Sequence, residues 1–413
     1  MAELPEALIE LFARLDARGQ RAWLVGESLH DLRLGLPLRA WELTTTAPAG
    51  DLFEAFPHAV SIDPERGVVM VPTAAGPVDL APLRFGPSPA DDLARRDFSV
   101  LAMALDPLSG TLLDPYSGER DREHRLLRGV GSARERLGED PLRALRAARL
   151  VAEQGYRVDA ELAEAMEEVA PQLETVAPYR LRGELSRLLL ADGCREGLEL
   201  IRRTGIEGVL LQATGKGMGK GAGKGMGKGA GEGVGKDAAA LAAAMPAKLG
   251  IRLAAWLRGA GAAAFLRKLR FGKPLSPEVL LRLDHHPIDS AVRPSNDPAV
   301  RRLLGRLDAQ TLEELFALRE AELRLSGSTS AERGLAALRA AIERVSSNAE
   351  RTRRREALAI GGREVMEALG SGPGHRVGEA LRFLGERVSD DPACNERERL
   401  QALLQEWLRA HPD

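Results

Sequence analysis

Strand-like sequence patterns end near Ser132 in this chain of 413 residues. Before that point, short apolar runs bounded by Gly, Pro or Asp predict β-strands. These runs lie at 22–25, 68–71, 78–80, 101–105 and 111–113. After it, Leu, Ala, Arg and Glu dominate, and apolar residues recur at helical spacing, as at Leu181, Leu185 and Leu188. The pattern predicts an α/β head followed by an all-helical remainder.

Composition excludes several classes of protein. The chain is 44% hydrophobic and 29% charged, which is typical of globular proteins, and its formal net charge of −2 gives no global attraction to nucleic acid. Aromatic residues make up only 4%, which argues against an extended base-stacking surface. The amphipathic first segment lacks a basic region, and no apolar run reaches the ~18 residues of a membrane span. We therefore expect a cytoplasmic protein with no membrane partner.

The cysteines give no sign of a metal site. Cys194 and Cys394 lie far apart in the sequence and match no metal-ligand spacing. We expect two inert, buried thiols in a reducing compartment.

Several short motifs follow one another along the head. A strand ends at Gly26 and leads into a helical stretch with Asp31, and Asp79 lies on a later strand. The other motifs are 39–47 (RAWELTTTA), 95–102 (RRDFSVLA), 113–118 (LDPYSG) and 139–149 (EDPLRALRAAR). In this order they resemble the class II tRNA nucleotidyltransferase (CCA-adding enzyme) and bacterial poly(A) polymerase family. Further along the chain, 179–190, 251–287 and 358–395 are similar to the family's neck, body and C-terminal part.

The resemblance implies an elongated, multidomain protein with an α/β nucleotidyltransferase head and an all-α neck, body and tail. The expected parts are a head at 1–130, a helical neck at 131–212, a Gly/Lys-rich insert at 213–240, a helical body at 241–350 and a helical tail at 351–413. The insert has no counterpart in the family. Its alternating glycines offer no side-chain face to a core, so we interpret it as a flexible linker. It is either a tolerated expansion of a surface loop or a tether whose lysines contact an RNA backbone.

The catalytic metal motif departs from the family pattern. The family has Asp-x-Asp on a strand, where side chains at i and i+2 share a face and bind two Mg²⁺ ions. In this chain the same positions read Ala40-Trp41-Glu42, so the first carboxylate is missing and the second is longer by a methylene. Asp79 matches the family's carboxylate on the neighbouring strand and could hold one ion together with Glu42. We expect Mg²⁺ binding to be weak or absent.

Two other changes affect the same motif. Glu27 replaces the second glycine of the family's pair, and we expect its charge to oppose the phosphates of a nucleotide. His30 replaces an arginine, whereas Asp31 and Gly35 are kept.

The positions that handle the nucleotide in the family are better kept. They are Gly26, Asp31, Arg95, Arg96, Asp97, Asp140 and Arg143. Two neighbouring guanidiniums suit phosphate oxygens, and a carboxylate and a guanidinium three positions apart on a helix share a face that can read a base edge. Leu101 replaces an asparagine of the family, which removes one polar contact. The alternative is structural, with Arg–Asp ion pairs that tie the head to the neck.

Two further clusters are candidates for sites. Arg351, Arg353, Arg354 and Arg355 match the tail region that contacts tRNA in the family, and their alternative is a solvated helix face. The sequence Asp284-His285-His286 is similar to part of a metal-dependent phosphohydrolase motif whose remaining ligands are absent. A histidine pair at a helix end before Pro287 is the favoured interpretation.

The resemblance implies an RNA 3′-end nucleotidyltransferase by descent, which adds CMP or AMP from CTP or ATP to tRNA or other RNA 3′ ends without a template. Its activity is expected to be weakened or lost because of the Ala40-Trp41-Glu42 sequence. One alternative is an inactive pseudoenzyme that binds RNA or a nucleoside triphosphate. Another is a structural partner that regulates an active paralogue. DNA is not expected as a partner.

Overall fold

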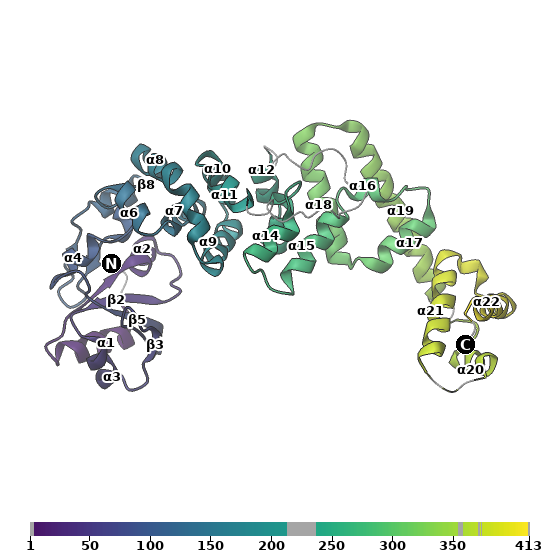
Figure 1. Cartoon of the computed structure of the whole chain (residues 1–413), viewed down its shortest axis with the longest axis horizontal. Helices are drawn as coiled ribbons and strands as arrows, with labels where there is room; N and C mark the ends of the chain where they lie inside the picture. The colour runs from purple at the N-terminus through teal and green to yellow at the C-terminus, as the bar shows by residue number, and fades with distance from the viewer. Residues whose placement is uncertain (1–3, 213–236, 354–357, 371, 373, 412–413) are drawn as a thin grey trace. The chain divides into compact units, whose positions relative to one another are not determined.

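The computed structural model describes residues 4–212, 237–353, 358–370, 372 and 374–411. The packing divides the chain into two compact units (Figure 1). Unit 1 comprises Met1–Ala243 and Gly259–Gly272, and unit 2 comprises Ala244–Arg258 and Lys273–Asp413. Most of the Gly/Lys-rich insert lies outside the described residues. The finer division of the chain into neck, body and tail stays a prediction.

Unit 1 begins with a seven-stranded mixed sheet in the order β3-β4-β5-β2-β1-β6-β7. Its strands are β1 (Ala22–Val25), β2 (Trp41–Thr45), β3 (Val60–Asp63), β4 (Val68–Thr73), β5 (Gly76–Pro82), β6 (Ala104–Leu105) and β7 (Leu112–Leu113). β2 and β5 run parallel, with Glu42 opposite Asp79, and the other neighbouring pairs are antiparallel. A separate parallel pair joins β8 (Leu126–Leu127) and β9 (Arg157–Val158).

The two faces of the sheet differ at β2 and β5. Trp41, Leu43 and Leu80 point to one face, where they join a buried core that includes residues of α1 (Glu6–Asp16) and α3 (Ala49–Ala55). Because side chains alternate along a strand, Glu42 and Asp79 point to the opposite face. The core on one side of the sheet therefore fixes the register that places these two carboxylates side by side.

Helices make up the rest of unit 1 (Figure 1). They are α2 (Gly26–Leu34), α4 (Pro89–Leu93), α5 (Gly118–Glu123), α6 (Ala133–Glu139), α7 (Leu142–Gln154), α8 (Ala160–Val169), α9 (Pro178–Leu190), α10 (Cys194–Arg203), α11 (Ile206–Gln212), α12 (Ala238–Ala243) and α14 (Ala262–Lys268), with 3-10 turns at Ser99–Leu101 and Ala170–Thr175. α7 packs against both α9 and α10. Its buried face is rich in Ala and Leu, but it also carries the fully buried Arg149.

Unit 2 is helical throughout its described residues. Its helices are α13 (Leu249–Trp256), α15 (Leu275–Asp284), α16 (Ile288–Ala291), α17 (Asp297–Arg306), α18 (Ala309–Ser326), α19 (Thr329–Arg353), α20 (Gly362–Leu369), α21 (His375–Asp390) and α22 (Arg397–Ala410), with a 3-10 turn at Pro392–Cys394. One core lies among α16 to α19, and another joins α20, α21 and α22. No described helix is both long and apolar enough to cross a membrane.

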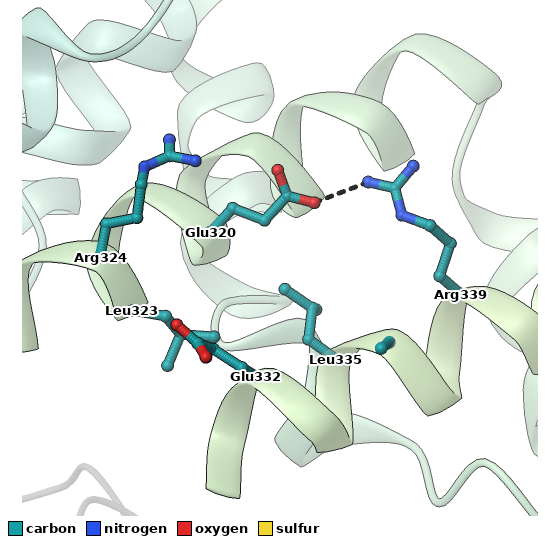
Figure 2. Close-up of a pocket in the computed structure, with 7 residues that line it drawn as sticks. Glu320, Leu323, Arg324, Glu332, Leu335 and Arg339 are labelled. Atoms are coloured by element: carbon teal, nitrogen blue, oxygen red, sulfur yellow. Dashed lines mark hydrogen bonds and ion pairs between the residues drawn. The ribbon is translucent and has the colours of Figure 1, made fainter. Parts of the chain in front are cut away.

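A hollow of about 250 Å³ lies between α18 and α19 (Figure 2). Its lining combines Leu323 and Leu335 with the ion pair between Glu320 and Arg339, whose charged atoms are 2.9 Å apart. None of the nucleotide-handling or metal residues expected from the sequence lines this hollow.

The predicted fold class, an α/β head followed by a largely helical remainder, is confirmed. The strand expected at 101–105 is mostly wrong, since Ser99–Leu101 forms a 3-10 turn and only Ala104–Leu105 pairs in the sheet. The whole run is buried, and a short buried apolar run does not distinguish a strand from a helical turn. The cysteines also differ from expectation, because Cys194 is buried but Cys394 is partly exposed. Burial raises the pKa of the Cys394 thiol, which lowers the fraction present as reactive thiolate.

Candidate nucleotide and metal site

Gly26 marks the point where β1 ends and α2 begins. Its φ of 68° lies in the left-handed region, which glycine adopts without strain. A Cβ at this position would collide with the carboxylate of Glu42 and the guanidinium of Arg96. The backbone of residue 26, the carboxylate and the guanidinium therefore meet at one place, and only glycine fits there.

Hydrogen bonds with the first turn of α2 hold Glu42 in position. Its backbone N–H donates to Ser28 Oγ (2.9 Å), and Ser28 Oγ donates to the carbonyl oxygen of Val25 (3.0 Å). The backbone N–H of Glu27 donates to the Glu42 carboxylate. Burial raises the pKa of Glu42 to about 7 against the opposing charge of Arg96, and the negative charge of Glu27 adds to the rise. The group therefore titrates close to neutral pH.

Asp79 lies directly opposite Glu42 on β5, on the same face of the sheet. Burial raises its pKa as well. The methyl group of Ala40 lies just before β2 and offers no ligand, and no cluster of three or more His, Cys, Asp or Glu suited to a metal occurs among the described residues. Mg²⁺ commonly binds one or two carboxylates and completes its octahedron with substrate phosphates and water. Glu42 and Asp79 fit one such ion and do not fit a pair.

Arg96 lies next to Glu42, and Arg95 precedes Arg96 in the sequence. Arg96 Nη1 donates to the carbonyl oxygen of Leu101 at 3.5 Å, and its Nε is buried with no hydrogen-bond partner among the described residues. Arg95 is exposed and pairs with Glu139 at 3.2 Å. The Leu101 side chain is buried, so this position contributes only its backbone oxygen. Both arginines retain donors that could bind phosphate oxygens.

Glu27 does not present a free charge to the site. Its carboxylate pairs with Arg149 on α7 and with Arg187 on α9, the latter at 3.1 Å. Burial alone would raise the pKa of Glu27, but the charges of Arg149 and Arg187 outweigh it and lower the pKa from 4.5 to about 2. The positive charges of Arg149 on α7 and Arg187 on α9 therefore largely neutralise Glu27, which weakens the expected repulsion between Glu27 and phosphates.

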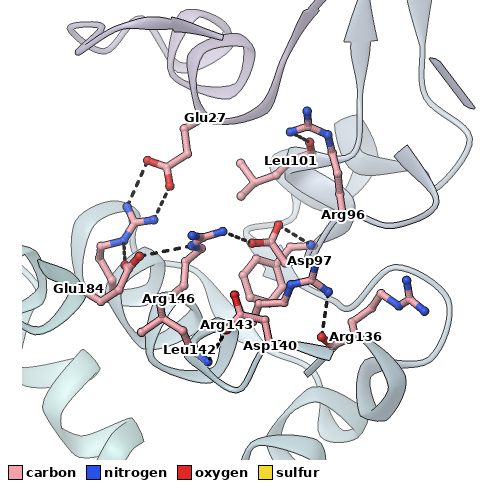
Figure 3. A network of polar contacts seen from close by, with 12 residues as sticks. Glu27, Arg96, Asp97, Leu101, Arg136, Asp140, Leu142, Arg143, Arg146 and Glu184 are labelled. Carbon is pink, nitrogen blue, oxygen red and sulfur yellow. Dashed lines mark hydrogen bonds and ion pairs between the residues drawn. The ribbon is translucent and has the colours of Figure 1, made fainter. Parts of the chain in front are cut away.

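Asp97 takes part in the same network (Figure 3). It is buried and accepts a hydrogen bond from Arg146 Nη1 at 2.7 Å, and Arg146 in turn contacts Glu184 on α9 at 3.4 Å. Burial would raise the pKa of Asp97, but the charge of Arg146 outweighs it and lowers the pKa. This geometry matches the structural alternative, an ion pair that ties the head to α7.

Asp140 and Arg143 do not pair with each other. Asp140 binds Arg180 on α9 at 2.6 Å. Arg143 donates to the carbonyl oxygens of Arg136 (2.8 Å) and Arg95 (2.9 Å). Arg143 also pairs with Glu139 at 3.1 Å, and its Nε–H and second Nη2–H are not used in these bonds. A role in reading a base edge stays a prediction.

Asp31 lies farther along α2, away from the contact between Gly26 and Glu42. It accepts a hydrogen bond from the side-chain amide of Gln154, at the end of α7, at 3.1 Å. The neighbouring His30 is buried, with Nε2 2.6 Å from the hydroxyl of Tyr156. These contacts join the end of α2 to the end of α7.

The remaining candidates lie in unit 2. Arg354 and Arg355 lie outside the described residues, as do the side chains of Arg351 and Arg353. His285 Nδ1 lies 2.9 Å from the carbonyl oxygen of Leu281 at the end of α15, as expected for a helix-end histidine. Burial and the nearby arginines lower the pKa of His286 to about 4, so this ring is neutral at pH 7.

Sequence reasoning did not identify the buried cation Arg149 as the centre of a network. Arg149 contacts Glu153 at 2.6 Å and Glu184 at 2.5 Å, in addition to Glu27. The available signal was the three-residue spacing of Arg143, Arg146 and Arg149 within an apolar helix. An arginine on the buried face of such a helix requires carboxylate partners elsewhere in the chain.

Two family descriptions match parts of this chain. "Poly A polymerase head domain" matches residues 83–128, and "Probable RNA and SrmB- binding site of polymerase A" matches residues 155–214.

Curated relatives include several that add nucleotides to RNA. The CCA-adding enzyme of Geobacillus stearothermophilus is 28% identical over 435 residues, which covers 97% of this chain and 96% of the relative. The CCA-adding enzyme of Geobacillus thermodenitrificans is 30% identical over 222 residues, 50% of this chain and 55% of the relative. The CC-adding tRNA nucleotidyltransferase of Shouchella clausii is 32% identical over 191 residues, 46% of this chain and 50% of the relative. In the last two comparisons the match spans about half of each curated relative.

Solved structures share the fold over nearly the whole chain. The Bacillus stearothermophilus CCA-adding enzyme in complex with CTP superimposes with a TM-score of 0.72 at 25% identity, covering 98% of each chain. The Thermotoga maritima CCA-adding enzyme complexed with tRNA has a TM-score of 0.67 at 17% identity and covers 98% of this chain and 97% of that one. The second likeness supports the fold alone.

The ion pairs of Glu27 predict a pH-dependent contribution to stability. The lowered pKa means that the contribution is complete above about pH 4.5 and is lost as the pH falls toward about 2. We expect Glu27→Gln to lower the free energy of unfolding by about 2 kcal/mol at pH 7, after allowance for the partial exposure of the carboxylate. Urea denaturation at pH 7, 4.5 and 3 measures the difference, which should shrink across this range.

Glu54→Gln is the control, because Glu54 is exposed on α3. It should change stability by less than about 0.5 kcal/mol at every pH. A Glu27→Gln effect that is equally small, or that does not change with pH, would show that the ion pairs contribute no net stability.

Proposed function

We propose that the chain is a member of the class II tRNA nucleotidyltransferase and bacterial poly(A) polymerase family, and that it adds CMP or AMP to the 3′ end of tRNA-like RNA without a template. CTP and ATP are the proposed donors. A relative with the same fold and 25% identity has been solved with CTP, and a curated relative with 32% identity is a CC-adding tRNA nucleotidyltransferase, which supports CTP and tRNA as substrates. The observation that carries the proposal is the pair Glu42 and Asp79, opposite each other on neighbouring strands, with the carboxylate of Glu42 against the glycine turn at Gly26.

The chemistry transfers one nucleotidyl group. The 3′-hydroxyl oxygen of the RNA forms a bond to the α-phosphorus, the bond to the β-phosphate oxygen breaks, and pyrophosphate leaves while the hydroxyl loses its proton. Mg²⁺ held by Glu42 and Asp79 would neutralise charge on the triphosphate and help to orient it. Gly26 allows the phosphates to approach the backbone, and Arg95 and Arg96 supply donors for phosphate oxygens.

Three features of this chain weaken the reaction in our proposal. Ala40 removes the carboxylate that would complete a two-ion site, and each 1.4 kcal/mol lost from transition-state stabilisation costs about tenfold in rate. The extra methylene of Glu42 shifts its oxygens relative to an aspartate. Because the pKa of Glu42 is about 7, a proton competes with the cation near neutral pH.

A pseudoenzyme that binds RNA or nucleotide is the second candidate. It is favoured by the engagement of Asp97, Asp140 and Arg143 in contacts within the protein. An assay that measures turnover and RNA binding separately distinguishes the two functions.

The first test uses tRNA lacking its CCA end, labelled CTP or ATP, and Mg²⁺ or Mn²⁺. We expect slow extension of the RNA, which rises as the pH increases through about 7 because Glu42 must lose its proton to bind the cation. Glu42→Ala and Asp79→Ala should each lower the rate at least about a hundredfold, because each removes one of two ligands. Gel analysis of the extended RNA measures the rate.

Glu54→Ala is the matched control for the loss of a carboxylate and should keep the wild-type rate. Extension that survives in Glu42→Ala and Asp79→Ala would exclude this site as the catalytic centre. No extension, combined with salt-sensitive RNA binding, would establish the pseudoenzyme instead.

The second test restores the family's motif. Ala40→Asp combined with Glu42→Asp should raise the rate by at least about tenfold, because it supplies the missing ligand of a two-ion site. Adding Glu27→Gly should give no further gain and should lower stability, since Glu27 is bound by Arg149 and Arg187.

Ala40→Asn with Glu42→Asp is the control, since it has nearly the same shape without the charge. If both double variants have the same rate while remaining folded, the loss of a carboxylate at position 40 does not limit the activity.

A further inference from the structure

Phe85 is an exposed aromatic ring that contacts Arg95, one of the residues expected to bind the nucleotide. It follows the end of β5, the strand that carries Asp79, and 49% of its surface is exposed. The guanidinium carbon of Arg84 lies 5.1 Å from the ring centre, and that of Arg95 lies 5.6 Å from it. Only Phe53 and Tyr179 share this degree of exposure among the aromatic residues that the structure describes.

The loop that carries Phe85 is anchored on both sides. Leu83 packs against the core cluster that includes Leu93, and its N–H donates to the carbonyl oxygen of Thr45 at 2.8 Å. On the other side, a Cβ at Gly86 would collide with the carboxylate of Asp91, which also accepts a hydrogen bond from the N–H of Ser88 at 3.2 Å. An aromatic ring on an anchored loop binds a partner with little loss of conformational entropy.

The ring is connected to the carboxylate pair through adjacent residues. Arg95, which contacts the ring, is followed by Arg96, whose guanidinium lies against Gly26 and Glu42. The carbonyl oxygen of Arg95 also accepts a hydrogen bond from Arg143, the residue expected to read a base edge. Phe85 therefore contacts one of the two adjacent arginines that are expected to bind the phosphates of a nucleotide.

The charges around the ring suit a nucleic-acid ligand. Arg84 is exposed, and among the described residues no carboxylate lies within ion-pair distance of it. A free guanidinium next to an exposed ring provides a phosphate contact and a stacking surface together, which is the usual combination for a single-stranded nucleotide.

We propose that Phe85 stacks against a nucleobase bound at the candidate site, while Arg84 contacts an adjacent phosphate. The inference rests on the proposed function, which brings both an RNA 3′ end and a nucleoside triphosphate to this site. Either molecule supplies the same chemistry, a planar base next to phosphate, and the experiment distinguishes the two sources.

The test compares Phe85→Ala, Phe85→Leu and Phe85→Trp with the wild type. The RNA probe is a tRNA-like hairpin with 2-aminopurine as its 3′-terminal base, and a second hairpin has no base at that position. Fluorescence measures Kd for each hairpin at one fixed salt concentration, and the KM for CTP and for ATP is measured by extension of RNA.

Phe53→Ala is the matched control, because Phe53 is 41% exposed on α3, which packs on the other face of the sheet.

Phe85→Ala and Phe85→Leu should weaken binding about tenfold, and Phe85→Trp should restore it, because stacking requires a planar ring rather than an apolar side chain. If the base comes from RNA, the loss appears in Kd for the 2-aminopurine hairpin and is absent with the baseless hairpin. If the base comes from the triphosphate, the loss appears in the KM for CTP and ATP while both hairpins bind normally.

Two results would overturn the inference. Binding constants within about twofold of wild type in all three Phe85 variants would exclude stacking. An equal loss with both hairpins, without rescue by Phe85→Trp, would show that the ring acts without a base. If the wild-type protein binds neither RNA nor nucleotide, the proposed function fails as well, which separates that outcome from the failure of Phe85 alone.

Discussion

The buried guanidinium of Arg149 constrains how the head of this protein packs on the helices that follow it. No part of its side chain is exposed, and an unpaired charge in such a place costs about 3–5 kcal/mol. Its carboxylate partners come from α2 (Glu27), α7 (Glu153) and α9 (Glu184). The requirement to satisfy one charge therefore joins the first turn of α2 to α7 and α9. Arg146 and Asp97 make a second connection of the same kind next to it.

This network and the candidate site share the same short segment. Gly26 touches the carboxylate of Glu42, while the next residue, Glu27, pairs with the helices on the other side. The scaffold that positions the glycine turn is thus supported by charges that have no part in binding a metal. These ion pairs do not involve residue 40, so the packing of the head on α7 and α9 does not depend on a carboxylate there.

The sequence predicted the fold class because periodicity changes so clearly near Ser132, and it predicted that Glu42 and Asp79 belong together because a family resemblance supplied the neighbouring strand. It did not predict the partners of Asp97 and Asp140. Those depend on which arginines of α7 and α9 the tertiary structure brings within reach, and spacing along one helix does not specify contacts between helices. The edge strand β3 was also missed, since its exposed residues leave no burial pattern.

We propose that Glu42 and Asp79 hold one divalent ion and that the missing carboxylate at position 40 prevents a second. The number of bound ions is measured directly by Mn²⁺ titration followed by electron paramagnetic resonance. The titration includes a CTP analogue whose α–β bridge cannot be cleaved. The account predicts one bound Mn²⁺ per chain with no magnetic coupling to another ion, lost in Asp79→Ala. A coupled Mn²⁺ pair, as expected for ions about 4 Å apart, would contradict it.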